Sequence, residues 1–145
     1  MSEKISYQHG PQEKLGILLV NLGSPEAPTP SAVRKYLAQF LADPRVVEAN
    51  RFIWWWVLHG IILRIRPSRS AKAYQKVWTE DGSPIITTSM AQQRGLQARL
   101  GEGFLVELGM RYGNPRMSDA LDRMMAAGCE DVVVLPMFPQ YCSAT

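Results

Sequence analysis

The spacing of apolar residues along the chain predicts three strands. Residues 15–20, LGILLV, form a continuous apolar run that stops at a polar turn, which is typical of a strand buried on both faces. Residues 104–110 and 132–135 have a similar character, and the second of these runs is β-branched and ends at Pro136. The chain therefore contains three candidate core strands that lie far apart in the sequence.

Helical periodicity fills the intervals between these strands. The N-cap signals are Ser31 and Ser83, and the stop signals are Asp43 before a proline, Pro67, and Gly128 just after a helix end. The predicted helices span residues 31–41, 48–66, 68–78, 84–100 and 117–127. Strands alternating with helices predict an α/β fold, in which a parallel sheet of three to four strands carries helices on both faces, as in half of a Rossmann or flavodoxin domain.

The predicted topology places any ligand site at one edge of the sheet. In open α/β sheets, ligands bind beyond the carboxyl ends of the strands. Those ends lead into loops 21–30, 111–115 and 136–145, so we expect these loops to line the site. The polar residues 1–14 are expected to be a flexible lead-in, which leaves residues 15–145 as the domain.

The composition is that of a folded domain with a mild positive charge. A chain of 145 residues with 46% hydrophobic content has room for one domain with a core. The 16 Lys and Arg residues are spread along the chain, and the net charge of +3 suits an acidic small molecule or an anionic membrane surface. The sequence has no helix-turn-helix, aromatic RNA-binding or zinc pattern, so no nucleic-acid partner is expected. The two cysteines, Cys129 and Cys142, have no CxxC spacing and indicate a reducing, cytoplasmic setting.

Five short motifs along the chain carry a family resemblance. Each contains a turn-forming proline or glycine next to residues able to line a pocket. In order they are NLGSP at 21–25, FLADPRV at 40–46, GSP at 82–84, MRYGNP at 110–115 and LPMFPQY at 135–141. One such motif is a weak signal, but the five in this order and spacing resemble the ferrochelatase family, in particular its proteobacterial branch, over residues 15–145.

The resemblance implies an enzyme that inserts Fe(II) into protoporphyrin IX, the last step of heme biosynthesis, in a cleft between two similar α/β domains. In that family the metal-site histidine and its partner glutamate belong to the second domain, which we expect this chain to lack. The chain is then the N-terminal, porphyrin-holding portion, inactive alone, with no catalytic residue and no metal site. Its two histidines, His9 and His59, occupy no catalytic position of the family.

The site expected for this substrate consists of apolar walls and cations, because a porphyrin is a wide apolar disc with two propionates. On the family pattern, the predicted porphyrin-binding residues are Leu22, Arg66, Tyr74, Ser83, Arg111, Tyr112 and Phe138. The leucine and the aromatic residues are expected as walls, and the two arginines as partners of the propionates. Each residue type also has a structural interpretation, since apolar residues can plug the end of a sheet, arginines are ordinarily solvated, and a serine before proline caps a helix.

Residues 52–63 form an aromatic stretch that is too short to span a membrane. Spanning requires roughly 18 apolar residues, and no run in the sequence reaches that length. Three consecutive tryptophans, residues 54–56, cannot all face one core, and a cluster of cations at 64–72 follows directly. Two interpretations remain: an amphipathic lip with peripheral contact at the inner membrane, or a lip packed on protein.

No cofactor is expected, and Fe(II) enters as a substrate. Some members of the family bind a [2Fe-2S] cluster through a cysteine one position after Cys142, where this chain has Ser143, so no iron–sulfur cluster is predicted. Two other functions stay open: a short homodimeric chelatase for another tetrapyrrole, and a non-catalytic flavodoxin-like ligand-binding domain. A homodimeric chelatase would need metal-binding histidines in the chain. A flavodoxin-like domain would be supported by a G-x-G-x-x-G or P-loop motif after the first strand, and the sequence has neither motif there.

Overall fold

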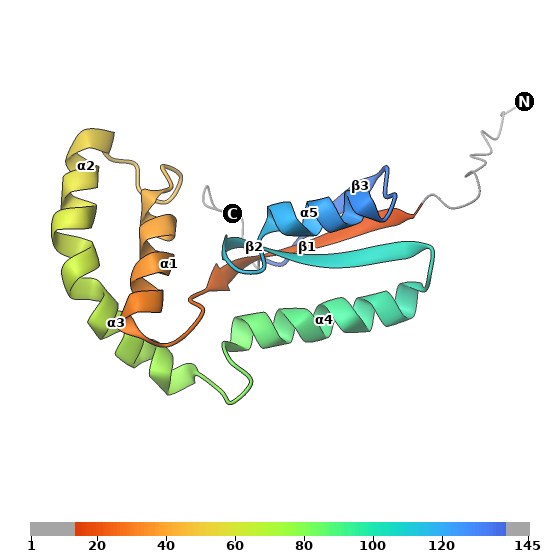
Figure 1. The fold of residues 1–145 in the computed structure, drawn as a ribbon, viewed down its shortest axis with the longest axis horizontal. Helices are drawn as coiled ribbons and strands as arrows, with labels where there is room; N and C mark the ends of the chain where they lie inside the picture. Colours follow the sequence, from red (N-terminus) through yellow and green to blue (C-terminus); the bar gives the residue numbers. More distant parts are fainter. Residues whose placement is uncertain (1–13, 139–145) are drawn as a thin grey trace, which may run out of the picture.

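The computed structural model describes residues 14–138, which form an open α/β sheet with a helical extension (Figure 1). Three parallel strands, β1 (Leu15–Ser24), β2 (Phe104–Gly113) and β3 (Val132–Pro136), have the order β2-β1-β3. The predicted parallel α/β fold is confirmed, with three strands in this part of the chain. The predicted lead-in, apart from Lys14, and the end of the third predicted loop, residues 139–145, lie outside the described residues.

Helices α4 (Pro84–Leu100) and α5 (Met117–Ala126) cover opposite faces of the sheet (Figure 1). The apolar residues of β1 alternate between them, because Leu18 packs in the cluster beneath α5 and Leu19 packs in the cluster beneath α4. A strand that buries side chains on both faces has a continuous apolar sequence. The prediction of helices on both faces of the sheet is therefore confirmed.

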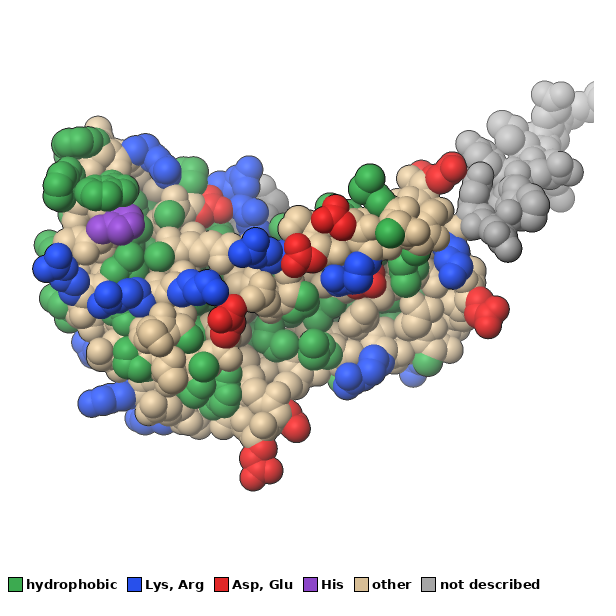
Figure 2. Space-filling view, viewed as in Figure 1, with side chains coloured by type: hydrophobic (Ala, Val, Ile, Leu, Met, Phe, Trp, Pro, Cys, Tyr) green, Lys and Arg blue, Asp and Glu red, His purple; other side chains and the backbone are tan. Residues whose placement is uncertain are grey.

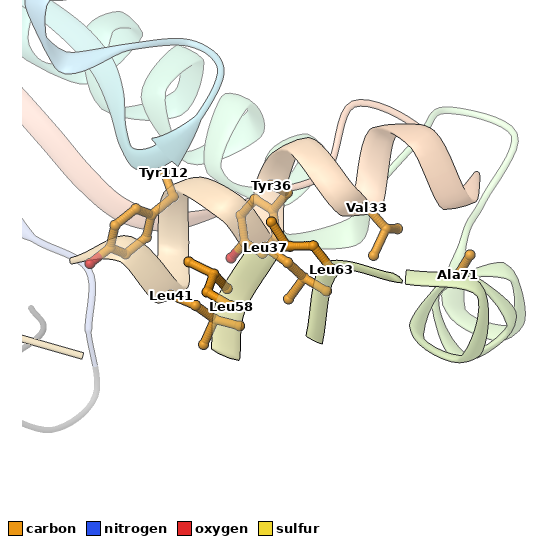
Figure 3. Packing of buried hydrophobic residues seen from close by; sticks show 8 residues of the cluster. All are labelled: Val33, Tyr36, Leu37, Leu41, Leu58, Leu63, Ala71 and Tyr112. Atoms are coloured by element: carbon orange, nitrogen blue, oxygen red, sulfur yellow. The ribbon is translucent and has the colours of Figure 1, made fainter. Parts of the chain in front are cut away.

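Three helices and a π-helical turn form a separate layer, which we call the helical arm. It consists of α1 (Pro30–Ala42), α2 (Arg51–Val57), the π-helical turn η1 (Leu58–Ile62) and α3 (Leu63–Val77). The arm lies beyond the carboxyl end of β1, where the topology predicts a ligand site (Figure 1). Its core residues are Val33, Tyr36, Leu37, Leu41, Leu58, Leu63, Ala71 and Tyr112 (Figure 3). Since Tyr112 belongs to β2, the core of the arm is continuous with the sheet.

The prediction that Pro67 ends one helix and that Ser68 begins another is wrong. α2, η1 and α3 follow one another without a break from residue 51 to residue 77, and Pro67 lies inside α3. The π-helical turn just before α3 changes the hydrogen-bond register, which helps the backbone to accommodate a proline about one turn later. The proline ring is fully buried, and burial of its apolar surface offsets the lost backbone hydrogen bond.

The first helix begins one residue earlier than predicted. Its N-cap is Thr29, whose hydroxyl accepts the backbone N–H of Ala32 at 3.4 Å, whereas Ser31 lies in the first turn. Pro30 follows the cap, where helices tolerate a missing N–H. At the other end of the chain, Gly128 follows α5 with a φ of 80°, so the predicted glycine after this helix is confirmed.

Strands β1 and β2 extend further than the sequence pattern predicts. Their pairing continues past residues 20 and 110 to the pair Ser24↔Gly113, so the first parts of two predicted loops are strand. Leu22 and Arg111 accordingly lie on strand ends. Backbone pairing between strands, which no local pattern reveals, holds these motif residues in place.

Candidate functional site

The predicted porphyrin-binding residues are not all brought together by the structure. Leu22, Tyr74 and Tyr112 share one apolar cluster, because Tyr112 is in the core of the helical arm and the other two are half-buried against it. Phe138 packs instead against the cluster beneath α5. The apolar wall that the structure supports is therefore formed at the junction of the arm with β1 and β2.

The start of α4 joins this region through the carboxyl end of β1. Asn21 Nδ2 donates to Ser89 Oγ at 3.1 Å, while its Oδ1 accepts the backbone N–H of Leu22 at 2.8 Å. Ser83 occupies the N-cap position of α4 and is buried, but its side chain makes no capping hydrogen bond. The interpretation of Ser83 as a helix cap is therefore correct for the position of its backbone, but the Ser83 hydroxyl makes no capping hydrogen bond. No sequence pattern singles out Asn21, although the NLGSP motif contains it.

Arg111, predicted as a cation for a propionate, forms an ion pair within the protein. Its Nη2 lies 2.7 Å from Asp43 Oδ2, and the Tyr112 hydroxyl donates to the same oxygen at 3.0 Å. The other carboxylate oxygen accepts the backbone N–H of Arg45 at 2.9 Å. An open pocket at this point is lined by Gln39, Ala42, Asp43, Pro44, Arg45, Arg111 and Tyr112. The sequence pattern indicates only a helix stop at Asp43, although the FLADPRV motif contains this residue.

The ionisation of these groups reflects their surroundings. The Arg45 backbone N–H is the largest cause that lowers the pKa of Asp43, and the Tyr112 hydroxyl and the Arg111 charge lower this pKa further. Burial is the main cause that raises the phenol pKa values of Tyr36, Tyr74 and Tyr112. At neutral pH the wall is therefore made of uncharged phenols beside an ionised carboxylate.

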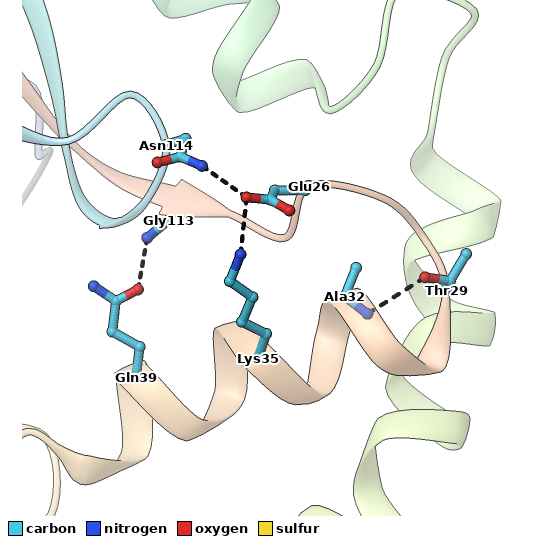
Figure 4. Close-up of polar contacts among 7 residues, drawn as sticks. All are labelled: Glu26, Thr29, Ala32, Lys35, Gln39, Gly113 and Asn114. Carbon is cyan, nitrogen blue, oxygen red and sulfur yellow. Dashed lines mark hydrogen bonds and ion pairs between the residues drawn. The ribbon is translucent and has the colours of Figure 1, made fainter.

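A second pocket lies between α1 and the loops that follow β1 and β2 (Figure 4). The Glu26 carboxylate accepts from Lys35 Nζ at 3.3 Å and from Asn114 Nδ2 at 2.7 Å, which links the two loops to the helix. The buried Ser24 hydroxyl at its edge has no hydrogen-bond partner among the described residues. With a volume of about 30 Å³, the pocket holds water-sized guests, so it is not a porphyrin site.

The outer face of the helical arm combines exposed apolar side chains with cations (Figure 2). The exposed apolar residues are Phe52, Ile53, Trp55, Trp56, Ile61 and Ile65. Arg66 is exposed on α3, and within the described residues neither it nor the neighbouring cations Arg64, Arg69 and Lys72 form an ion pair. Trp54 differs from the other two tryptophans, because it is half-buried and donates its indole N–H to the Leu41 carbonyl at 2.7 Å.

The histidine of the arm interacts with its own helix. His59 Nδ1 donates to the Trp55 carbonyl at 3.0 Å, and its ring stacks on the Trp55 ring at 4.7 Å between centroids. His9, Cys142 and Ser143 lie outside the described residues. Among residues 14–138, no group of three or more His, Cys, Asp or Glu side chains could hold a metal ion. No helix in the same range is long and apolar enough to cross a membrane.

Fold and site together define the class of the protein. A parallel sheet ends beneath a helical arm, an apolar wall lies at the junction, and an exposed arginine stands on the arm. This arrangement is that of an α/β protein with a candidate small-molecule site beyond the carboxyl ends of its strands.

The comparisons with known proteins identify the family. The ferrochelatase family model matches residues 14–145. The chain is 51% identical to a ferrochelatase of Thioalkalivibrio sulfidiphilus over 143 residues, 56% identical to that of Pectobacterium atrosepticum over 135 residues, and 51% identical to ferrochelatase 2 of Shewanella oneidensis over 140 residues. These alignments cover 96%, 92% and 94% of this chain. The chain belongs to the ferrochelatase family. It spans 39–43% of the length of these relatives.

Proposed function

We propose that this chain forms the porphyrin-holding part of an enzyme that inserts Fe(II) into protoporphyrin IX to give protoheme. The observation that carries the proposal is the arrangement on α3. Tyr74 is half-buried in the apolar wall, and Arg66, about 12 Å earlier along the helix axis, is exposed and unpaired within the described residues. One helix thus supplies an apolar surface for the macrocycle and a cation for a propionate at its edge.

The roles that we propose for this chain and for the rest of the enzyme follow from the chemistry of metallation. Insertion requires that the macrocycle is bent, that two pyrrole protons are removed, and that dehydrated Fe(II) is delivered to the ring. We assign holding and orientation of the ring to Leu22, Tyr74, Tyr112 and Ser83, and binding of a propionate to Arg66. The base and the iron ligands are assigned to the part of the enzyme that this chain does not contain. Phe138 enters the proposal only as an outer contact, because it packs in a different cluster.

Arg66→Ala is expected to weaken protoporphyrin IX binding about tenfold, because it removes a charge-assisted hydrogen bond. The measurement is a fluorescence titration of the chain, with an iron-insertion assay on the same sample. Arg99→Ala is the matched control, since Arg99 is exposed on α4, away from the arm, and its loss should leave affinity unchanged. Binding without insertion supports the proposal. An unmodified chain that does not bind the porphyrin, or one that inserts iron by itself, would contradict it.

We propose that the arm also makes peripheral contact with an anionic membrane, at the inner membrane of the cell, while the protein is cytoplasmic. Trp55 and Trp56 are 52% and 60% exposed at the end of the arm, and Phe52 beside them is 75% exposed. Exposed aromatic residues next to cations that have no ion-pair partner within residues 14–138 suit the interfacial region of a bilayer, where rings are buried and arginines meet lipid phosphates. A poorly soluble substrate would then enter the site from the bilayer.

Trp56→Ala is expected to lower the partition coefficient onto anionic vesicles about tenfold, because the indole no longer enters the interface. Co-sedimentation with vesicles of phosphatidylglycerol and phosphatidylethanolamine measures the effect. Met125→Ala, at a position 72% exposed on α5, is the control and should bind as the unmodified chain does. If the unmodified chain does not co-sediment, the arm packs on protein instead.

A further inference from the structure

The Asp43 carboxylate is shared by two residues of the proposed site. One oxygen, Oδ2, accepts both from Arg111 at 2.7 Å and from the Tyr112 hydroxyl at 3.0 Å. The second oxygen accepts the backbone N–H of Arg45 at 2.9 Å, which fixes the carboxylate at the end of α1. Asp43 therefore connects the end of the arm's first helix with two consecutive side chains at the end of β2.

The ion pair is largely shielded from solvent. The side chain of Asp43 is 14% exposed and that of Arg111 is 23% exposed, so solvent screens this pair less than a surface pair. An anionic ligand that approached Arg111 would meet a neutral pair, and it would have to displace the carboxylate to bind the guanidinium. Arg66 is exposed and has no ion-pair partner among the described residues, so it presents its full charge to a ligand.

The aromatic rings near the Asp43–Arg111 ion pair indicate how this pair affects the apolar wall. The Arg111 guanidinium carbon lies 5.4 Å from the centre of the Tyr112 ring, and Phe40 packs edge-on against the same ring at 5.1 Å. With its hydroxyl held by Asp43 and its ring in contact with both of these groups, Tyr112 has little freedom to rotate. Loss of the carboxylate would free both Arg111 and Tyr112.

We propose that Asp43 is a positioning residue of the porphyrin site, which neutralises Arg111 and fixes Arg111 and Tyr112 as an uncharged part of the wall. Arg66 then carries the recognition of a propionate by itself. The proposal rests on the porphyrin-holding function proposed above, and it assigns Arg111 a role in the wall instead of the propionate-binding role expected from the sequence.

The test compares two probes, protoporphyrin IX and its dimethyl ester, which lacks both carboxylates. For the full chain, we define the affinity ratio as the affinity for protoporphyrin IX divided by the affinity for the dimethyl ester. This ratio isolates the electrostatic recognition of the propionates from the apolar contacts. Arg66→Gln is expected to lower this ratio about tenfold, whereas Arg111→Gln should change it less than about twofold. Asp43→Asn, nearly the same shape without the charge, should raise the ratio several-fold because Arg111 becomes available, and the double variant Asp43→Asn/Arg111→Gln should return it to the original value.

Glu107→Gln is the matched control. Glu107 pairs with Arg123 at the same distance, 2.7 Å, and its side chain is also 14% exposed, but the pair lies between β2 and α5, away from the arm. It should leave the affinity ratio unchanged even if it lowers stability. Circular dichroism of each variant establishes that it is folded.

Three outcomes would overturn the proposal. If Arg111→Gln lowers the ratio as much as Arg66→Gln, Arg111 binds a propionate. If Asp43→Asn leaves the ratio unchanged, as Glu107→Gln does, Asp43 belongs to an ordinary structural ion pair. Should Asp43→Asn not fold, the comparison of Arg66→Gln with Arg111→Gln still decides whether Arg111 binds a propionate. If the unmodified chain binds neither probe, the proposed function fails and this inference falls with it, a result different from binding with unchanged ratios.

Discussion

Gly23→Ala is expected to destabilise the chain by more than about 3 kcal/mol, enough to abolish or nearly abolish folding. Gly23 has a φ of 103°, which side-chain-bearing residues rarely adopt. A Cβ atom at this position would lie 1.8 Å from the Tyr112 carbonyl oxygen. That oxygen belongs to the backbone of β2, which pairs with β1 here, so the clash cannot be relieved by a side-chain rotation. Chemical denaturation followed by circular dichroism measures the loss.

Gly95→Ala is the matched control for this substitution. Gly95 lies inside α4, where an added Cβ would meet no heavy atom within 4 Å other than those of its chain neighbours and of the nearby backbone of its own helix. Alanine there should stabilise the chain by about 0.5–1 kcal/mol, because it restricts the unfolded backbone and favours the helix. A Gly23→Ala variant as stable as the unmodified chain would show that β1 and β2 do not pair in this register.

The position of Gly23 explains why the strand ends matter for the site. It is paired with Tyr112, and it directly follows Leu22, so the close approach of the two backbones sets the distance between two wall residues. The Tyr36 hydroxyl donates to the Gly23 carbonyl at 3.4 Å, which connects the same point to the core of the arm. A substitution at Gly23 would thus alter the site as well as the stability.

The central parts of the strands and of α4 and α5 could be predicted from the sequence, because each satisfies a local rule. The apolar run at 15–20 is buried on both faces, and Gly128 has the φ that ends a helix. The extension of β1 to Ser24 follows instead from pairing with Gly113, about ninety positions away in the chain. The helical environment of Pro67 depends on burial in the arm, and a local rule assigns this proline as a helix stop.

In the candidate site, too, some features could be predicted from the sequence, and others depend on contacts between distant residues. The family pattern placed Leu22, Tyr74 and Tyr112 in one site, and the structure joins them in one cluster. The partner of Asp43 is Arg111, 68 positions away, so the local sequence reveals only the effect of a polar residue before proline. Phe138 follows β3 and packs beneath α5, whereas Met137 beside it packs in the cluster beneath α4. Successive side chains of extended backbone point to opposite faces of a sheet, and a motif does not reveal which residue points to which face.

Leu58→Ala is expected to lower the free energy of opening of the helical arm by about 2–4 kcal/mol. Leu58 is 2% exposed and is the buried residue of the π-helical turn between α2 and α3 (Figure 3). Its side chain holds this turn against α1. α2 itself contains no fully buried residue, so apart from the half-buried Trp54, which donates to the Leu41 carbonyl, it has few contacts with the core of the arm. Hydrogen exchange should show α2 and η1 amides exchanging about 100-fold faster, while β1 amides change much less.

Ile61→Ala tests whether burial, and not the loss of side-chain volume, is the cause. Ile61 lies three residues later in the same π-helical turn but is 55% exposed, so its truncation should change the opening free energy by less than about 0.5 kcal/mol. If both variants speed exchange equally, the turn is held by its backbone rather than by the core. If exchange in Leu58→Ala rises uniformly over the sheet as well, the arm and the sheet unfold as one unit, and the arm cannot move independently to admit a substrate.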